Sequence, residues 1–322
     1  MVALCILACL ALAAAPFETP PRLVTLSDGR HIALRCSGSG SPTVILESGY
    51  AGSSLAWTKV QPVLARRWRV CSYDRAGYGL SDLGPMPRDG KAVAADLDAT
   101  LRKARIGGPF ILVGHSAGAL YMRLFADRRW ADVAGMVLVD PSVEHQDARL
   151  AELLGPGAGS LASLQARDAR CLTAAQQGAS PPPKECPKSM VGPRGVDEML
   201  TRVSELNTLF GATSDEVEAG RRSLGDLPLI VLTAGETASD APPEAQAAVT
   251  AAWDGLHKEL AARSTRGRDE IVPGATHMMM FDRPDAICVA VAEVIDQARR
   301  TLRTAPVRAS SSASEMTKAG VR

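Results

Sequence analysis

The sequence Gly-His-Ser-Ala-Gly at residues 114–118 lies where a continuously apolar run gives way to a helical pattern. The run from Phe110 to Val113 shows no alternation, which is typical of a parallel strand covered on both faces. After it, apolar side chains recur at offsets of three and four, which predicts a helix packed on a sheet. Gly114 and Gly118 remove the Cβ atoms that a sharp turn around Ser116 would crowd. The stretch therefore predicts a central strand and a turn that exposes a hydroxyl, although a serine that merely caps the helix would fit the motif alone.

The rest of the chain alternates in the same way. The first two of eight predicted strands are joined by the hairpin sequence SDGR, and the later ones alternate with helical patterns over 91–104, 117–129 and 284–302. This pattern predicts an antiparallel start that leads into a mostly parallel sheet flanked by helices. The predicted strands span residues 22–26, 31–36, 43–48, 68–74, 110–114, 135–140, 227–235 and 268–274.

The alternation stops between the sixth and seventh strands, where residues 141–225 are rich in alanine and leucine. We expect this segment to be a helical cap inserted after strand 6, so that residues 22–140 and 226–302 form the core. Residues 303–322 are polar and are expected to be a disordered tail. Residues 1–21 form an apolar leader, whose uncharged stretch is shorter than the roughly 20 residues of a membrane-spanning helix. A signal peptide fits that length, with an anchor or a buried helix as alternatives.

Charge and cysteines restrict the partners and the compartment. The chain has 36 Lys and Arg against 35 Asp and Glu, so we expect no nucleic-acid partner. None of the seven cysteines lies in a C-x-x-C pair, and no metal site is predicted. Cys36 and Cys71 fall on predicted strands, and Cys171 and Cys186 bracket a loop, so each pair is either a disulfide or two buried thiols. With the leader, these features predict an exported protein that is periplasmic, secreted or anchored to a membrane through its N-terminal segment.

A serine hydroxyl is a weak nucleophile at neutral pH, so Ser116 needs a base nearby, and imidazole is the best-matched side chain. His277 follows the last predicted strand. Loops of this kind gather at the carboxyl edge of a parallel sheet, where Ser116 also emerges, so His277 is the expected base. The other four histidines are expected to be structural: His31, His115, His145 and His257.

Four stretches in a fixed order resemble the α/β-hydrolase superfamily of serine hydrolases with a cap after strand 6: ESGYAGSS (47–54), YDRAGYGLSD (73–82), GHSAG (114–118) and PGATHMMMFDRPDAI (273–287). The resemblance spans about residues 22–302. It implies an α/β-hydrolase fold with an eight-stranded, mostly parallel sheet. When Cys36, Cys71 and the sequence VLVDPS are added to these four stretches, the chain resembles exported bacterial members of the superfamily.

A tetrahedral intermediate needs two N–H donors for its oxyanion. The start of the helix supplies the backbone N–H of Ala117. The resemblance implies that the second is the backbone N–H of Tyr50, in a loop where many relatives read His-Gly and this chain reads Ser48-Gly49. The loss of that histidine leaves the donor intact because no side chain is required. Three residues of the stretch 73–82 are expected to be scaffold: Asp74, Arg75 and Ser81.

The acid that would orient His277 has two candidate locations. In many relatives it lies three residues after the glycine that ends strand 7, but here that position is Ala238. Glu236 and Asp240 are close by but out of register. A second arrangement takes the acid from the end of strand 6, which is Asp140. We favour Asp140 as the acid, with Asp240 and Glu236 as alternatives.

The expected activity is hydrolysis of a carboxylic ester through an acyl-serine intermediate, without a metal or organic cofactor, on a small-molecule ester or amide. A serine nucleophile argues against the epoxide hydrolases and haloalkane dehalogenases that share this scaffold and use an aspartate. A small-peptide or amide hydrolase, a cofactor-free perhydrolase and a non-catalytic ligand-binding protein on the same fold are the alternatives. The sequence does not predict the oligomeric state.

Overall fold

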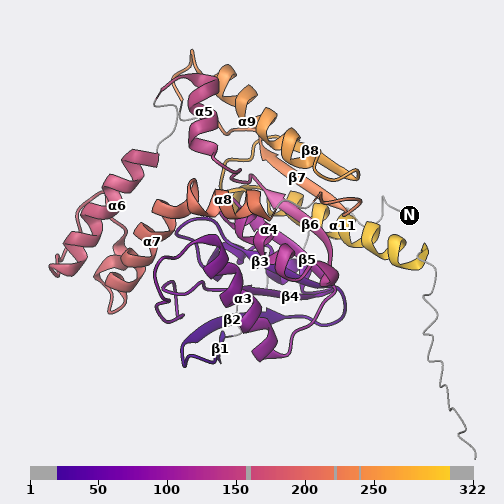
Figure 1. Ribbon diagram of the computed structural model, residues 1–322, viewed down its shortest axis with the longest axis horizontal. Coiled ribbons are helices and arrows are strands. Elements are labelled where there is room, and N and C mark those ends of the chain that lie inside the picture. The colour runs from indigo at the N-terminus through magenta and orange to yellow at the C-terminus, as the bar shows by residue number, and fades with distance from the viewer. Residues whose placement is uncertain (1–19, 157–160, 221–222, 239–240, 305–322) are drawn as a thin grey trace, which may run out of the picture.

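A computed structural model describes residues 20–156, 161–220, 223–238 and 241–304. Most of the expected leader and tail lie outside the described residues, so those expectations stay predictions. The described residues contain one sheet with helices on both of its faces (Figure 1). No helix in these ranges is long and apolar enough to cross a membrane.

The sheet has eight strands, as the sequence predicts. The strands are β1 (Arg22–Thr25), β2 (His31–Ser37), β3 (Thr43–Glu47), β4 (Arg69–Tyr73), β5 (Phe110–His115), β6 (Val133–Val139), β7 (Leu229–Ala234) and β8 (Gly267–Val272). The helices are α2 (Gln61–Leu64), α3 (Gly90–Ala104), α4 (Gly118–Arg128), α5 (Gln146–Leu154), α6 (Leu161–Gln176), α7 (Gly195–Leu209), α8 (Ala212–Ala219), α9 (Gln246–Ala261), α10 (Met279–Asp282) and α11 (Pro284–Thr304). Three short 3-10 helices are η1 (Ser54–Trp57), η2 (Trp130–Asp132) and η3 (Lys188–Val191).

The strand order is β1-β2-β4-β3-β5-β6-β7-β8. Strand β2 is antiparallel to both of its neighbours, and all later pairings are parallel. Strand β5 pairs with β3 and β6 in the interior of the sheet. The predicted antiparallel start and central strand are therefore confirmed, and the carboxyl ends of β5, β6 and β8 lie at one edge.

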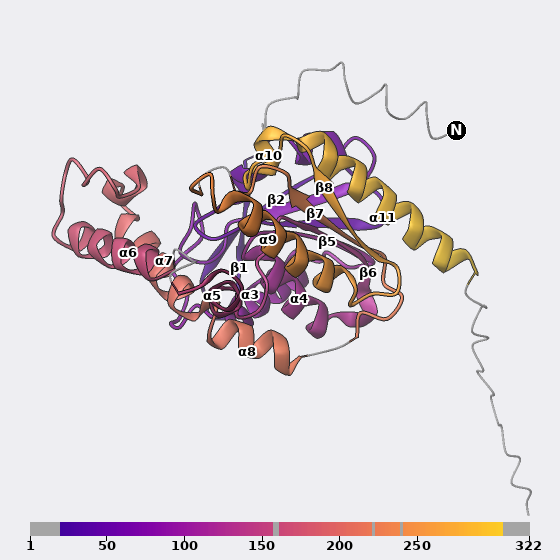
Figure 2. The same cartoon turned by 90° about the horizontal axis from the view of Figure 1, so that it is seen from above.

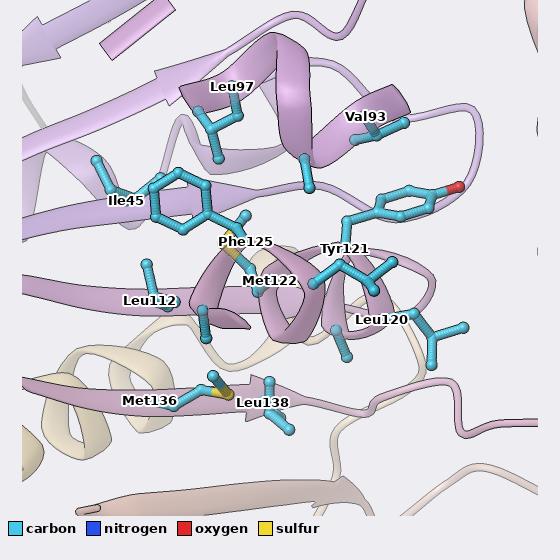
Figure 3. Packing of buried hydrophobic residues seen from close by; sticks show 14 of the residues in the cluster. Ile45, Val93, Leu97, Leu112, Leu120, Tyr121, Met122, Phe125, Met136 and Leu138 are labelled. Atoms are coloured by element: carbon cyan, nitrogen blue, oxygen red, sulfur yellow. The ribbon is translucent and has the colours of Figure 1, made fainter. Parts of the chain in front are cut away.

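Alternate residues of the central strands pack into two cores. Ile45 and Leu112 face α3 and α4, whose side chains fill one layer (Figure 3). Val44 and Ile111 face the opposite layer, where α11 packs on the sheet (Figure 2). Burial of such side chains stabilises the fold by about 1.5–3 kcal/mol each. Covering on both faces explains why the run before Ser116 is continuously apolar.

Helices α5 to α8 all lie between β6 and β7 in the chain. Helices α6 and α7 pack against each other and extend from one end of the molecule in both views (Figures 1 and 2). This is the segment that the sequence predicts to be a cap.

The structure contains both of the disulfides that the sequence suggested. Cys36 and Cys71 lie directly opposite each other on the antiparallel strands β2 and β4. Cys171 of α6 is bonded to Cys186, which precedes η3. The second bond closes a short loop beside α6. In the chain-entropy model, closing a loop of about 15 residues raises the free energy of unfolding by about 3 kcal/mol.

Candidate active site

Ser116 lies in the turn between β5 and α4. Its φ of 52° is in the left-handed region, which costs a non-glycine residue about 1–3 kcal/mol. The surrounding backbone holds it there, because Ser116 N donates to Val139 O at 3.1 Å and Ser142 N donates to Ser116 O at 3.0 Å. Ser116 also lines the cavity described below. The strained turn thus places the residue beside open space.

The glycines around Ser116 are required by close packing. A Cβ atom at Gly114 would lie 2.7 Å from the carbonyl oxygen of Gly118, and one at Gly118 would lie 2.7 Å from that of Ser48. A Cβ atom at Gly49 would lie 2.9 Å from the Cβ of Ser116. These distances are shorter than real Cβ contacts, so only glycine lets the turn and the loop after β3 approach each other this closely.

His277 and Asp140 lie together at the carboxyl edge of the sheet. His277 Nδ1 is 2.6 Å from Asp140 Oδ2, and the Asp140 side chain is completely buried. Burial raises the pKa of Asp140, but the hydrogen bond and charge of His277 outweigh it, so the pKa lies below its ordinary value. An ionised Asp140 fixes the proton of His277 on Nδ1, which leaves Nε2 free to accept one.

The second oxygen of Asp140 is held by two further donors. Ala234 N donates to Oδ1 at 3.0 Å, and Trp253 Nε1 donates to it at 2.9 Å. The sequence analysis does not single out Trp253, which lies on α9 and is separated from Asp140 by 113 residues. No local pattern points to this contact, because it depends on how α9 packs across the end of the sheet.

The two alternative acids differ from Asp140. Glu236 is exposed to solvent, and only its backbone N–H is engaged, donating to Ala275 O at 2.9 Å. Among the described residues, the carboxylate of Glu236 has no hydrogen-bond partner. His277 Nδ1 contacts Asp140 instead. Asp240 lies outside the described residues.

His115, next to Ser116 in the chain, supports the loop that carries His277. Its Nε2–H donates to the carbonyl oxygen of His277 at 2.8 Å, and the two rings are 4.7 Å apart between centroids. Burial lowers the pKa of His115 to about 3, so the ring is neutral at physiological pH. It can therefore orient His277 without placing a second positive charge beside it.

The other histidines make contacts of their own. His31 Nδ1 is 2.9 Å from Asp82, and His145 Nε2 lies within 3.6 Å of carboxylates on α8. His257 is buried, with Nδ1 2.7 Å from Thr233 Oγ1 and Nε2 2.9 Å from Pro141 O. These contacts are of the kind expected of structural histidines.

Ala117 directly follows Ser116 in the chain, and Gly49, which precedes Tyr50, packs closely against Ser116. Within the described ranges, the backbone N–H of neither Tyr50 nor Ala117 has a hydrogen-bond acceptor. Ala117 is fully buried at the start of α4, and Tyr50 lines the same cavity as Ser116. Two backbone N–H groups without a partner near a serine can stabilise a negatively charged oxygen.

Ser116, His277 and Tyr50 share a cavity of about 510 Å³. Its other wall comes from α5, α6 and α7: Leu150, Leu161, Leu164, Leu206 and Leu209. Asp147 of α5 contributes the only carboxylate among the described lining residues. No three His, Cys, Asp or Glu side chains gather in a metal-binding arrangement anywhere in the part of the chain that the structure describes.

Residues 44–291 match the model of a family described as the alpha/beta hydrolase family. An uncharacterized Bacillus subtilis protein, YqjL, is 24% identical over 260 residues, which are 80% of this chain and 85% of that protein.

Two solved structures have a similar fold. One is a thermophilic esterase from Thermogutta terrifontis, with a TM-score of 0.58 and 19% identity over 87% of this chain and 99% of that one. The other is an alpha/beta hydrolase fold protein from Burkholderia ambifaria, with a TM-score of 0.56 and 22% identity over 85% and 99% of the two chains.

Proposed function

The chain belongs to the alpha/beta hydrolase family, and from that premise we propose that it hydrolyses carboxylic esters through an acyl intermediate on Ser116. The observation that carries this proposal is the hydrogen bond of 2.6 Å between His277 Nδ1 and buried Asp140, because His277 lines the same cavity as Ser116. A serine beside an imidazole that is oriented by a carboxylate is suited to acyl transfer.

The proposed reaction has two halves. His277 Nε2 takes the proton from Ser116 Oγ while Oγ attacks the carbonyl carbon of the ester. The same proton then passes to the departing alcohol as its bond to the acyl carbon breaks. In the second half, His277 takes a proton from water, the hydroxide attacks the acyl carbon, and the proton returns to Ser116 as the acid leaves. Asp140 stabilises the imidazolium in both halves.

The oxyanion that forms in each half would be stabilised by the N–H groups of Tyr50 and Ala117. Support comes from their position beside Ser116 and from the absence of any other acceptor for them among the described residues. Removal of one such donor costs other serine hydrolases about 10²- to 10³-fold in turnover.

We assign substrate selection to the cap, residues 141–225, because its leucines form the apolar wall of the cavity. This wall suits a neutral ester with an aliphatic or aromatic group. Asp147 is the one carboxylate in the described lining, which includes no lysine or arginine, so anionic substrates would be disfavoured.

A panel of substrates tests this function. The wild-type protein is expected to hydrolyse p-nitrophenyl esters of neutral aliphatic acids faster than monoesters of dicarboxylic acids with the same chain length. Aminoacyl p-nitroanilides should react more slowly than any neutral ester. Faster turnover of the anilides would favour an amide hydrolase, and a folded protein that turns over no ester would favour a ligand-binding role.

Trp253 is expected to support the triad through its bond to Asp140. Trp253→Phe removes one hydrogen bond to a charged group, which is worth about 1.5–3 kcal/mol, so we expect kcat to fall by about 10-fold or more. Trp130→Phe, on η2, is the matched control and should leave kcat unchanged. An unchanged kcat in folded Trp253→Phe would contradict this role.

We also propose that the protein is exported. The two disulfides, Cys36–Cys71 and Cys171–Cys186, suit an oxidising compartment. Cell fractionation, with the protein recovered outside the cytoplasm and its cysteines mapped without reduction, tests this proposal.

A further inference from the structure

The loop Ser48–Tyr50 is bonded to the helices that form the far wall of the cavity. We propose that α6 and α7 hold this loop in its reactive orientation through two buried carboxylates, Asp168 and Glu205. The inference rests on the proposed function, since it assumes that the N–H of Tyr50 stabilises the oxyanion. Asp168, Glu205 and the arginine between Glu205 and the loop, Arg75, are then positioning residues for the reaction.

The first connection runs through Arg75, which follows β4. Its Nε and Nη2 donate to the carboxylate of Glu205 on α7 at 2.8 and 3.1 Å. The same guanidinium donates from Nη1 to Ser48 O at 2.8 Å and from Nη2 to Gly49 O at 2.9 Å. Arg75 and Glu205 are both buried. A planar guanidinium with fixed donors thus joins a helix of the cap to two successive carbonyl groups of the loop.

This geometry bears directly on the N–H of Tyr50. Gly49 C=O and Tyr50 N–H belong to one peptide group, which is planar and trans, so they point in opposite directions. When Arg75 holds Gly49 O, it also orients Tyr50 N–H. The sequence predicts a scaffold role for Arg75. The structure shows that Arg75 supports the Gly49–Tyr50 peptide group and that its partner Glu205 lies on α7.

The second connection runs through the side chain of Tyr50. Its hydroxyl donates to Asp168 of α6, which is completely buried. Arg202 of α7 donates from Nε to the same carboxylate oxygen at 3.4 Å, and its guanidinium lies 5.3 Å from the centre of the Tyr50 ring. Arg75 therefore holds the peptide group that joins Gly49 to Tyr50, and Asp168 of α6 holds the Tyr50 hydroxyl, with α7 contributing to both connections.

Two conservative variants test the proposal. Tyr50→Phe removes only the hydroxyl that bonds Asp168, and Glu205→Gln removes one of the two buried carboxylate charges that pair with Arg75, the other being that of Glu47. Both keep the backbone N–H groups, Ser116 and His277. Glu152→Gln, on the exposed surface of α5, is the matched control. An alkyl trifluoromethyl ketone, which adds to the serine and places an oxyanion beside the N–H groups, reports on this site independently of turnover.

If α6 and α7 position the loop, Tyr50→Phe and Glu205→Gln should each lower kcat and ketone affinity together, by about 10-fold or more, while KM changes far less. Glu152→Gln should match the wild type. Normal kcat and ketone affinity in folded Tyr50→Phe would overturn the inference, as would a rise in KM alone. Tyr50→Phe decides the matter if Glu205→Gln does not fold. Failure of the wild type to hydrolyse any ester would instead overturn the proposed function.

Discussion

Ser116→Ala is expected to lower ester hydrolysis by about 10⁴-fold or more, because it removes the atom that forms the acyl intermediate. The residual rate would reflect binding and the N–H donors alone. Alanine fits the same tight turn, in which Ser116 has a φ of 52° and donates and accepts only through its backbone among the described hydrogen bonds. The fold should therefore survive, and circular dichroism can verify it.

The control for Ser116→Ala is Ser27→Ala, in the exposed turn between β1 and β2. Ser27→Ala makes the same chemical change far from Ser116 in the sequence, so this variant should keep wild-type turnover. Measured hydrolysis of p-nitrophenyl butyrate by a folded Ser116→Ala variant at more than a few per cent of wild type would show that another group attacks the ester.

Asp140→Asn is expected to lower kcat by about 10²- to 10⁴-fold while the protein stays folded. Asparagine keeps the size of the side chain and an oxygen that can accept from Ala234 N and Trp253 Nε1. It loses the negative charge that would stabilise the imidazolium of His277, and its amide can favour the wrong tautomer. A role limited to the turn before Pro141 would survive the change.

The matched comparison is Glu236→Gln, which removes an exposed carboxylate with no described partner and should leave kcat near normal. Asp240→Asn completes the set. If the Asp140→Asn variant hydrolysed esters at a normal rate and either of these variants lost activity, the acid that orients His277 would lie in the loop after β7.

Residues close to strand ends are the most predictable part of the candidate site. Ser116 and His277 each follow a predicted strand, and parallel topology brings the carboxyl ends of such strands to one edge. The two glycines around Ser116 likewise indicate a local tight turn, because Cβ atoms at these positions would collide with the backbone.

The contact between Asp140 and His277 is harder to predict, because two loops leave that edge and the sequence does not show how far each one reaches. Contacts between distant segments left no periodic pattern at all. Trp253 meets Asp140 across 113 residues, and Tyr50 meets Asp168 across 118. Each depends on how a helix packs against the finished sheet, and no local spacing encodes that.

Covalent labelling reports directly on whether Ser116 is the nucleophile. The folded wild-type protein is treated with a fluorophosphonate, which loses fluoride when a nucleophilic serine attacks its phosphorus, and the modified peptide is mapped by mass spectrometry. We expect one label per chain, on Ser116, with none on Ser116→Ala. A wild-type protein that is folded but unlabelled, or a label that persists on Ser116→Ala, would contradict it.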